Sequence, residues 1–258
     1  TISEGSLDQR IRVDGGSSEL LDLSQVLNES FDQLEKNILR ERQFTSNASH
    51  ELRTPITAIL TATQSKPNTL EDYRDRLSSC AKSARSMRQL AGHLLELSRY
   101  DSGKTELQRE PTDLDILIDR CIQEIRPIAD QKSIRIQSEL EPVQAEVHAV
   151  GISQVVTNLL NNAVSYTDSG GEIHLRLTEA EGQIEIAVRD NGSGIAEDDL
   201  PNLFDRFYRG DKSRSDHGSG HYGLRLAISW ESARLHHGEL TEESKSGEGS
   251  IFTFRLPQ

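Results

Sequence analysis

Apolar residues recur every three or four positions through most of the first hundred residues, and this spacing is the strongest constraint on the fold. It places apolar side chains on one face of an α-helix. The pattern breaks at Lys66-Pro67-Asn68, because proline lacks a backbone N–H and ends a helix. We therefore predict two long helices joined by a turn. Their stripes are Leu20, Leu23, Leu27, Phe31, Leu34, Ile38, Phe44, Ala48, Leu52, Ile56 and Ile59, then Tyr73, Leu77, Cys80, Ala84, Met87, Leu90, Leu94 and Leu97.

Two antiparallel helices with one apolar stripe each cannot enclose a core by themselves. We expect this hairpin to pair with a second copy, which gives a homodimer built around a four-helix bundle. The second helix is predicted to end at Ser102-Gly103-Lys104, and the polar stretch from there to Pro111 is predicted to be a short linker.

After Pro111 the pattern changes to alternating helices and strands. In that order they predict a mixed sheet with helices on one face, an α/β sandwich. The fold class is therefore α+β and multidomain, a helical hairpin followed by this sandwich. Helices are expected near 113–131, 150–166 and 224–236, and strands near 134–140, 143–147, 172–178, 183–189, 239–242 and 250–256.

Composition narrows the class of protein further. The chain has 258 residues and a formal net charge of -13, which argues against nucleic-acid binding because that requires clustered Lys and Arg. No apolar run approaches the roughly 20 residues of a membrane-spanning helix. The chain begins at Thr1, and we interpret this end as cut from a longer protein, from which a membrane segment could have been removed. Cys80 and Cys121 are interpreted as buried thiols in a reducing compartment.

The segment His50-Glu51-Leu52-Arg53-Thr54-Pro55 lies within the first predicted helix. A lone helical histidine is usually an ordinary surface residue, but here Glu51 can polarise one ring nitrogen and make the other a better nucleophile. Thr54 is one turn after His50, where its hydroxyl could hold a water. Pro55 leaves the carbonyl of Glu51 without its usual partner, so we predict a kink below His50.

Two later segments have the composition of a nucleotide pocket, Asn158-Leu159-Leu160-Asn161-Asn162-Ala163 and Asp190-Asn191-Gly192-Ser193-Gly194-Ile195. Asn158 and Asn162 are one helical turn apart, so their amides point the same way. Asp190 follows a strand and can accept from the exocyclic amine of adenine. The alternatives are capping asparagines and a tight turn. We expect Gly192 and Gly194 to let the backbone approach the ring and Ile195 to pack on it.

In this order and at this spacing, the three segments resemble those of a bacterial two-component sensor histidine kinase. The resemblance implies a HisKA dimerisation and phosphoacceptor domain and a GHKL-type ATP-binding domain, preceded by part of a HAMP module. The implied domains are 1–40 (HAMP and connecting helix), 41–108 (hairpin) and 109–258 (catalytic ATP-binding domain). It also implies autophosphorylation of His50 from ATP, with Asn162 as a Mg²⁺ ligand. The phosphoryl group would pass to an aspartate of a response regulator receiver domain, and Thr54 would support phosphatase activity.

The resemblance extends to the remaining pocket residues. Phe204-Asp205-Arg206-Phe207-Tyr208-Arg209 is similar to the family's phenylalanine segment, in which the phenylalanines act as hinges and Arg209 reaches the phosphates. A mobile loop is expected from Gly210 to Gly220. Tyr166, Gly223 and Leu224 are further expected ATP-binding positions; Gly223 and Leu224 open a helix whose N-terminus would face phosphate.

The chain departs from the family pattern at Ser165, where lysine is usual, and at His221 and Arg225, where glycine is usual. Arg225 could replace the missing charge or block the triphosphate, so a weakened pseudokinase or regulator-binding scaffold is an alternative. An ATPase clamp of the GHKL type is a third, which the acceptor helix argues against. For the first 40 residues, a generic amphipathic helix is the alternative to HAMP. The resemblance places the chain in the cytoplasmic portion of a bacterial inner-membrane protein.

Overall fold

A computed structural model describes residues 10–11, 18–64, 69–102, 107–210 and 222–257. The chain forms two compact units, residues 1–83 and 84–258, and the boundary falls inside a helix. The first unit is helical, and the second contains every strand among the described residues.

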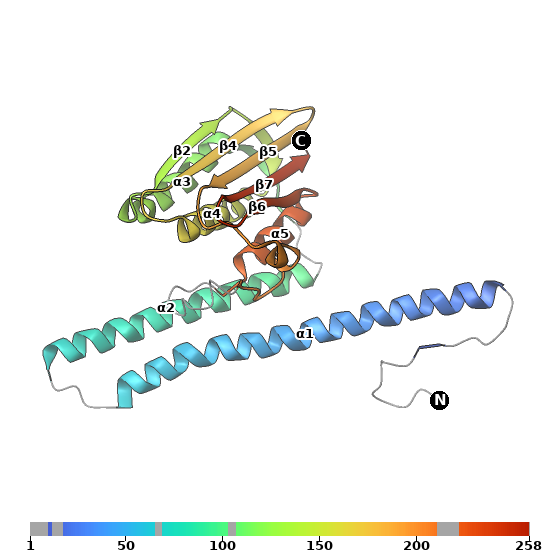
Figure 1. Ribbon diagram of the computed structural model, residues 1–258, viewed down its shortest axis with the longest axis horizontal. Coiled ribbons are helices and arrows are strands. Elements are labelled where there is room, and N and C mark those ends of the chain that lie inside the picture. Colours follow the sequence, from blue (N-terminus) through green and yellow to red (C-terminus); the bar gives the residue numbers. More distant parts are fainter. Residues whose placement is uncertain (1–9, 12–17, 65–68, 103–106, 211–221, 258) are drawn as a thin grey trace. The chain divides into compact units, whose positions relative to one another are not determined.

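Two long helices form a hairpin, as the apolar spacing predicted (Figure 1). Helix α1 spans Ser18–Gln64 and includes Pro55, and α2 spans Leu70–Asp101. The start of α2 is capped reciprocally, because Thr69 Oγ1 accepts from the N–H of Asp72 and Asp72 Oδ2 accepts from the N–H of Thr69, both at 3.1 Å. The predicted break at Lys66-Pro67-Asn68 lies outside the described residues, and the bend at Pro55 stays a prediction.

The apolar stripe of the hairpin is largely exposed in the first unit. Side chains that would form the core of a bundle are open to solvent, and the exposed fraction of Leu77 reaches 68%. Further along α2, in the second unit, Leu90 and Leu97 are fully buried. Exposed members of the stripe are Leu20, Leu23, Leu27, Leu34, Ile56, Tyr73 and Leu77.

Residues 10 and 11 lie against the N-terminal part of α1. Arg10 forms ion pairs with Asp32 and Glu35, and the amide of Asn28 both donates to and accepts from the backbone of Ile11. Residues 12–17 lie outside the described residues. The HAMP assignment of residues 1–40 stays a prediction.

The second unit contains a five-stranded sheet with the order β2-β4-β5-β7-β6. The β2–β4 pair is parallel and the other pairs are antiparallel, so the sheet is mixed, as predicted. Its strands are β2 (Arg135–Leu140), β4 (Glu172–Ala180), β5 (Gln183–Asp190), β6 (Glu239–Lys245) and β7 (Gly249–Pro257).

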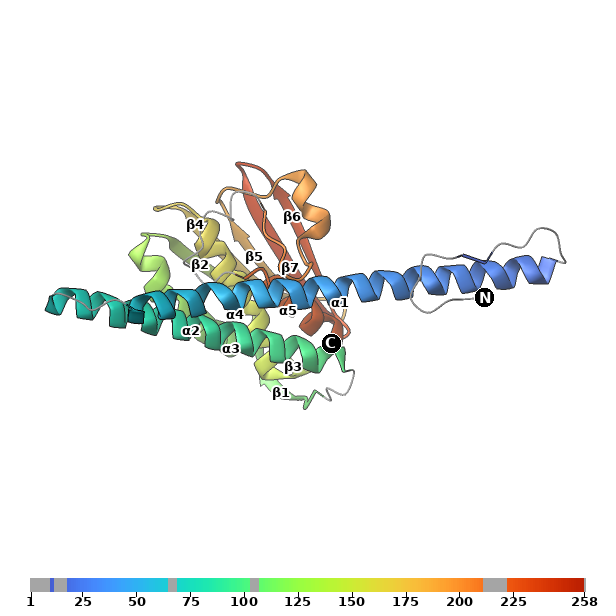
Figure 2. The ribbon, with the colours of Figure 1, turned by 90° about the horizontal axis from the view of Figure 1, so that it is seen from below.

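Helices α3 (Leu114–Gln131), α4 (Ala149–Tyr166) and α5 (Arg225–Leu235) cover one face of this sheet (Figures 1 and 2). Alternate strand residues are buried against them, as expected where one face of a sheet meets the core and the other meets water. Cys121 of α3 is buried as predicted, and burial raises the pKa of its thiol; Cys80, predicted to be buried, is only half-buried. The buried strand residues are Ile173, Leu175, Leu177, Ile184, Ile186, Val188, Phe252, Phe254 and Leu256.

One prediction about strands was wrong. The stretch interpreted as a linker up to Pro111 enters a short strand, β1 (Glu110–Asp113), and the strand at β3 (Gln144–Val147) pairs with β1 rather than joining the large sheet. The two strands pair through an antiparallel ladder of four residue pairs. Pro111 of β1 is compatible with this pairing because β1 is an edge strand, where a missing N–H can face away from the ladder. A short 3₁₀ helix, η1 (Glu197–Asn202), was also not anticipated.

Candidate functional site

The candidate acceptor residue, His50, lies on the exposed side of α1. His50 and Thr54 are both exposed and one turn apart, Glu51 is half-buried, and Pro55 is buried. A nucleophile must reach a phosphorus atom carried by another domain, and an exposed imidazole on a helix meets that requirement.

An open groove lies next to Thr54 in the first unit. It continues along α1 past Thr57 and Thr61 and is bounded on α2 by Asp75 and Arg76, whose Nη1 donates to the carbonyl of Ala62 at 3.2 Å. The groove therefore combines hydroxyl groups with one charge of each sign. Its lining is completed by Ala58, Ala62 and Ser79.

The two pocket asparagines of α4 have different surroundings. Asn158 is buried, and its Nδ2 donates to the carbonyl of Arg225 and to Ser229 Oγ, each at 3.2 Å. It therefore joins α4 to the first turn of α5. Asn162 is half-buried, and its side-chain amide makes no hydrogen bond to another described residue. Its oxygen is thus available to a ligand.

Asp190 ends β5 with a buried carboxylate, 5% exposed. Oδ1 accepts from the N–H of Gly192 at 2.9 Å. Burial raises the pKa of this carboxyl, and hydrogen bonds from the backbone of Gly192 and Ser250 oppose that rise. A buried acceptor of this kind is suited to an N–H donor such as the exocyclic amine of adenine.

The glycines after Asp190 have a packing role that differs from the one expected. A Cβ on Gly192 would lie 2.3 Å from the carbonyl oxygen of Tyr166, and one on Gly194, where φ is +62°, would lie 2.0 Å from that of Lys245. The close approach of neighbouring backbone therefore requires glycine at these two positions, independently of any contact with adenine. Ile195, expected to pack on the base, is half-buried against the core.

This packing joins several predicted pocket residues. The N–H of Ser193 donates to the carbonyl of Tyr166 at 3.1 Å, so the loop after β5 is fixed to the end of α4. The side chain of Tyr166 is 39% exposed.

The phenylalanine segment is tied to the start of α5. Phe207 has a left-handed φ of 64°, rare for a bulky residue, and its N–H donates to the carbonyl of Gly223 at 2.9 Å. Leu224 is fully buried and precedes α5, and Arg209 is half-buried. Most of the loop expected to be mobile, 211–220, and His221 lie outside the described residues.

Two of the three departures from the family pattern, Ser165 and Arg225, lie among the described residues, and they have different consequences. Ser165 Oγ donates to the carbonyl of Asn161 at 2.6 Å, and the cation at this end of α4 is instead Lys132, whose Nζ donates to the carbonyls of Val164 and Ser165. Arg225 is half-buried in the first turn of α5, and burial lowers the pKa of its guanidinium although Tyr166 opposes this. It has no ion pair with a described residue.

One further pocket candidate had no signal in the sequence. Thr167, which follows Tyr166, is 2% exposed, and its Oγ1 has no hydrogen-bond partner among the described residues. A buried hydroxyl without a partner, one residue after Tyr166, makes Thr167 a candidate for contact with a polar ligand. In the described parts of the chain, no three His, Cys, Asp or Glu side chains group as metal ligands.

Family models match both halves of the chain. The His Kinase A (phospho-acceptor) domain matches residues 40–103, and the "Histidine kinase-, DNA gyrase B-, and HSP90-like ATPase" matches residues 147–258. This chain belongs to the two-component sensor histidine kinases. The first match includes His50 of this kinase, and the second includes its pocket residues from Asn158 to Arg225.

Relatives support the assignment along the whole length of the kinase. It is 34% identical over 279 residues to the signal transduction histidine-protein kinase AfsQ2 of Streptomyces coelicolor, covering 100% of this chain and 50% of the relative. It is 33% identical over 272 residues to the sensor histidine kinase MtrB of Mycobacterium tuberculosis, covering 99% of this chain and 47% of the relative. The chain thus spans about half the length of these curated relatives.

Solved structures share the fold of the kinase. The histidine kinase AdeS of Acinetobacter baumannii aligns with a TM-score of 0.66 at 22% identity, over 81% of this chain and 97% of that one. The histidine kinase ThkA, solved in complex with the response regulator protein TrrA, aligns with a TM-score of 0.64 at 20% identity, over 94% of this chain and 68% of that one.

Proposed function

We propose that this chain autophosphorylates on His50 from ATP and then passes the phosphoryl group to an aspartate of a response regulator receiver domain. The observation that carries the proposal is the exposed His50 on α1, with Thr54 exposed one turn later, in a chain that also contains the ATP-binding fold. Family membership and the relatives named above support it.

Phosphoryl transfer depends mainly on positioning and charge neutralisation. A ring nitrogen of His50 attacks the γ-phosphorus, the bond to the bridging oxygen breaks, and ADP leaves. Glu51, the next residue, holds the ring proton at the other nitrogen and so directs the lone pair outward. In the phosphatase reaction, Thr54 Oγ1 orients a water that attacks the phosphorus of the receiver's aspartyl phosphate; the bond to the aspartate oxygen breaks and inorganic phosphate leaves.

The pocket residues have separate roles. Asp190 accepts from the adenine amine, and Tyr166, Gly192, Gly194 and Ile195 form the walls. Asn158 fixes α4 to α5. Arg209 and the backbone at Gly223 and Leu224 face the phosphates.

The residues present also fit a Mg²⁺ ion. The unpaired amide oxygen of Asn162 is a hard ligand, and Mg²⁺ takes its remaining ligands from phosphates and water. Bound there, Mg²⁺ neutralises charge on the phosphates.

The proposed partners are a second copy of the chain and a receiver domain. The exposed stripe on the hairpin supports a homodimer, because exposed apolar surface of that extent favours association. The groove beside Thr54 is a suitable place for the receiver domain, and the complex of ThkA with TrrA supports a partner of that class.

The proposed domains are 1–40 for HAMP and the connecting helix, 41–108 for dimerisation and phosphotransfer, and 109–258 for ATP binding. Within the described parts of the chain, no helix combines the length and apolar composition needed to cross a bilayer. We propose that the full-length protein is membrane-anchored and that this portion is cytoplasmic.

The test is incubation with γ-labelled ATP and magnesium, with His50→Gln as the control. Label that is acid-labile and absent from His50→Gln supports the proposal, because a P–N bond hydrolyses in acid. Label retained in His50→Gln, or a folded protein that takes up none, contradicts it.

A weakened kinase is the second candidate, and Arg225 is the observation that favours it. Its guanidinium is half-buried close enough to Tyr166 to interact with it electrostatically. If Arg225 obstructs the phosphates, Arg225→Gly will bind ATP more tightly than the unmodified chain; if Arg225 contributes charge, the variant will bind it more weakly.

A further inference from the structure

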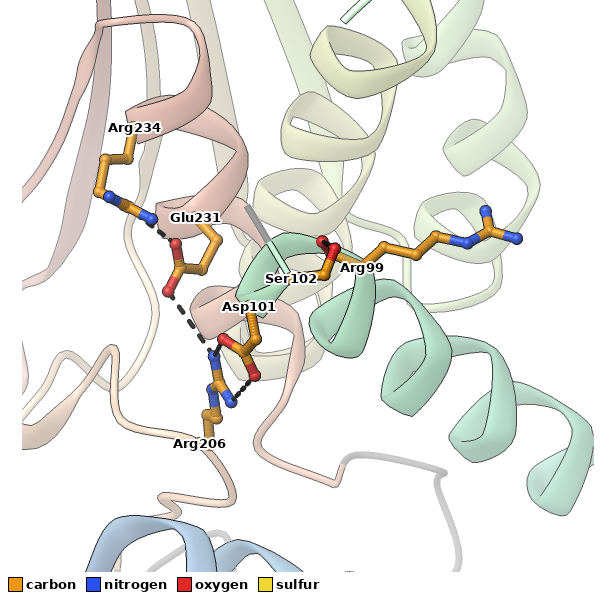
Figure 3. A network of polar contacts seen from close by, with 6 residues as sticks. All are labelled: Arg99, Asp101, Ser102, Arg206, Glu231 and Arg234. Atoms are coloured by element: carbon orange, nitrogen blue, oxygen red, sulfur yellow. Dashed lines mark hydrogen bonds and ion pairs between the residues drawn. The ribbon is translucent and has the colours of Figure 1, made fainter. Parts of the chain in front are cut away.

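One ion-pair cluster of the second unit joins the last turn of α2, the phenylalanine segment and α5 (Figure 3). Arg206 donates to both carboxylate oxygens of Asp101, at 2.7 Å and 2.6 Å, and lies 3.7 Å from Glu231. Partly exposed ion pairs of this kind are screened by water and salt. A different cluster consists of hydroxyl groups around Ser244 and contacts the loop that follows β5.

Three polar residues form a row at one end of the large sheet. Asp190 of β5 is directly opposite Ser250 of β7, and Ser250 is directly opposite Ser244 of β6. Residues opposite one another on neighbouring strands point to the same face of a sheet. For this row it is the helix-covered face, since Asp190 and Ser250 are only 5% and 7% exposed. The row therefore extends from the proposed adenine acceptor to the edge strand β6.

The hydroxyl of Ser244 has one proton and two lone pairs, and the contacts of this side chain use all three. Oγ donates to the carbonyl of Gly249 and accepts from the N–H of Ile195, each at 2.9 Å. Its third contact is Ser250 Oγ, also at 2.9 Å. Because the proton of Ser244 is directed at Gly249, Ser250 is the donor in this third contact. A hydroxyl bonded in three directions has a fixed position.

Each partner of Ser244 is next to Asp190 or belongs to its loop. Ser250 is opposite Asp190 in the sheet, and Ile195 closes the loop that follows Asp190. Gly249 has a φ of +92°, and a Cβ there would lie 2.1 Å from the carbonyl oxygen of Asp190. Gly249, whose carbonyl accepts from Ser244, thus packs directly on the backbone of Asp190.

The loop of residues 191–195 is held from two sides. On one side the N–H of Ser193 donates to the carbonyl of Tyr166 at the end of α4. On the other side the N–H of Gly247, in the turn between β6 and β7, donates to the carbonyl of Ser193 at 2.8 Å, and Ser244 accepts from Ile195. The contacts of Ser193 are made by backbone alone, whereas the contact of Ile195 depends on the Ser244 side chain. Substitution of Ser244 therefore changes one side of the loop and leaves the other in place.

We propose that Ser244 is a positioning residue of the nucleotide pocket, and that its hydroxyl holds Asp190 and the loop 191–195 in the geometry that receives the adenine base. This inference deepens the proposed function and rests on it. The three partners of Ser244 belong to the side of the pocket at Asp190, whereas the phosphates are proposed to meet Arg209. We therefore expect Ser244 to affect binding of the base and not of the phosphates.

Ser244→Ala tests this role by calorimetric titration with ADP and with AMP. The variant loses the acceptor for the loop, so ADP should bind about threefold to tenfold more weakly, the effect of one hydrogen bond. The same factor is expected for AMP, because the two ligands share the base. Ser244→Thr keeps the hydroxyl and should bind both ligands as the unmodified chain does.

Ser138→Ala is the matched control. Ser138 is exposed on β2, the edge strand at the other end of the sheet order, so its loss should leave both affinities unchanged. Unchanged ADP affinity in Ser244→Ala, or an equal loss in Ser138→Ala, would overturn the proposal. A loss for ADP that AMP does not share would overturn it too, because the effect would then lie at the phosphates.

Autophosphorylation kinetics separate positioning of the base from a general structural fault. In Ser244→Ala, KM for ATP should rise about threefold to tenfold, whereas the rate of His50 labelling at saturating ATP should stay unchanged. This split is expected because contacts to the base are the same before and during phosphoryl transfer. A lower rate at saturating ATP with an unchanged KM would overturn the role of Ser244.

Amide hydrogen exchange gives a readout that needs neither nucleotide nor kinase activity. Exchange at residues 191–195 should be faster in Ser244→Ala, because the N–H of Ile195 loses its acceptor, and unchanged in Ser138→Ala. Equal exchange in the unmodified chain and Ser244→Ala would contradict the proposal. If labelling fails in every protein while the exchange and ADP results hold, the kinase proposal is rejected and the role of Ser244 stands.

Discussion

The first unit, residues 1–83, and the second unit, residues 84–258 and called the catalytic unit below, bury their apolar residues to different extents. In the catalytic unit, Phe254, Leu159 and Ile186 are fully buried within one chain. In the first unit, Leu77 and Ile56 are 68% and 41% exposed although they follow an equally regular pattern. The difference teaches that regular apolar spacing predicts a helix or strand reliably, but not whether its partner lies in the same chain.

The largest effect is expected in the core of the catalytic unit. Phe254→Ala should lower the free energy of unfolding by about 3–5 kcal/mol, because it removes a fully buried ring and leaves a cavity. Urea denaturation followed by circular dichroism of the strands measures this. A loss below about 1 kcal/mol would show that this core is less close-packed than its burial indicates.

Protonation of His93 should also destabilise the second unit. Burial, together with the charge of Arg225, lowers the pKa of His93 to about 4. In the unfolded chain the pKa of this imidazole is about 6.5. The stability that neutral His93 contributes is therefore fully present above that pH and is lost as the pH falls toward 4. The loss should approach about 3 kcal/mol.

The slope of the unfolding free energy against pH is measured for the unmodified chain and for His93→Gln. The difference between the two slopes isolates the contribution of His93, because the carboxylates titrate in both proteins. Equal slopes between pH 6.5 and 5 would show that the imidazole is not held neutral by the fold.

On the hairpin, Leu77→Asp should weaken dimerisation about tenfold to a hundredfold and leave the melting temperature of the catalytic unit unchanged. Lys82→Glu, on the opposite side of α2 and exposed, is the control and should leave the dimer intact. Sedimentation velocity over a range of concentrations measures both. Dissociation by Lys82→Glu alone would place the interface on the other face.

The smallest effect on stability is expected at Asp190. Because burial raises the pKa of its carboxyl, the charged form costs stability at neutral pH, and Asp190→Asn should raise the melting temperature slightly. Nucleotide binding should weaken about tenfold to a hundredfold, as loss of a charge-assisted hydrogen bond requires. Calorimetric titration with ADP measures this, and unchanged affinity would remove Asp190 from the pocket.

The sequence predicted the long helices and the large sheet because each has a period that repeats over many residues. It did not predict β1, whose four residues include a proline and are too few to show a period. Nor did it predict the pairing of β3 with β1, because the burial pattern of a strand does not identify its partner.

For the site, local motifs located His50, Asn162 and Asp190, although their roles stay predictions. The role of Gly192 became visible only through its contact with Tyr166. The pair between Arg206 and Asp101 joins residues 105 positions apart, and no local pattern indicates it.

α1 continues without interruption from Ser18 to Gln64. In an α-helix each residue turns the side-chain direction by about 100°, so the azimuth of His50 is fixed by that of the stripe from Leu20 to Ile38. Inserting one residue between them would rotate the imidazole by about 100° about the helix axis, whereas inserting seven would almost restore its orientation. Twisting of the upstream end of α1 would thus be converted directly into the direction in which the imidazole of His50 faces.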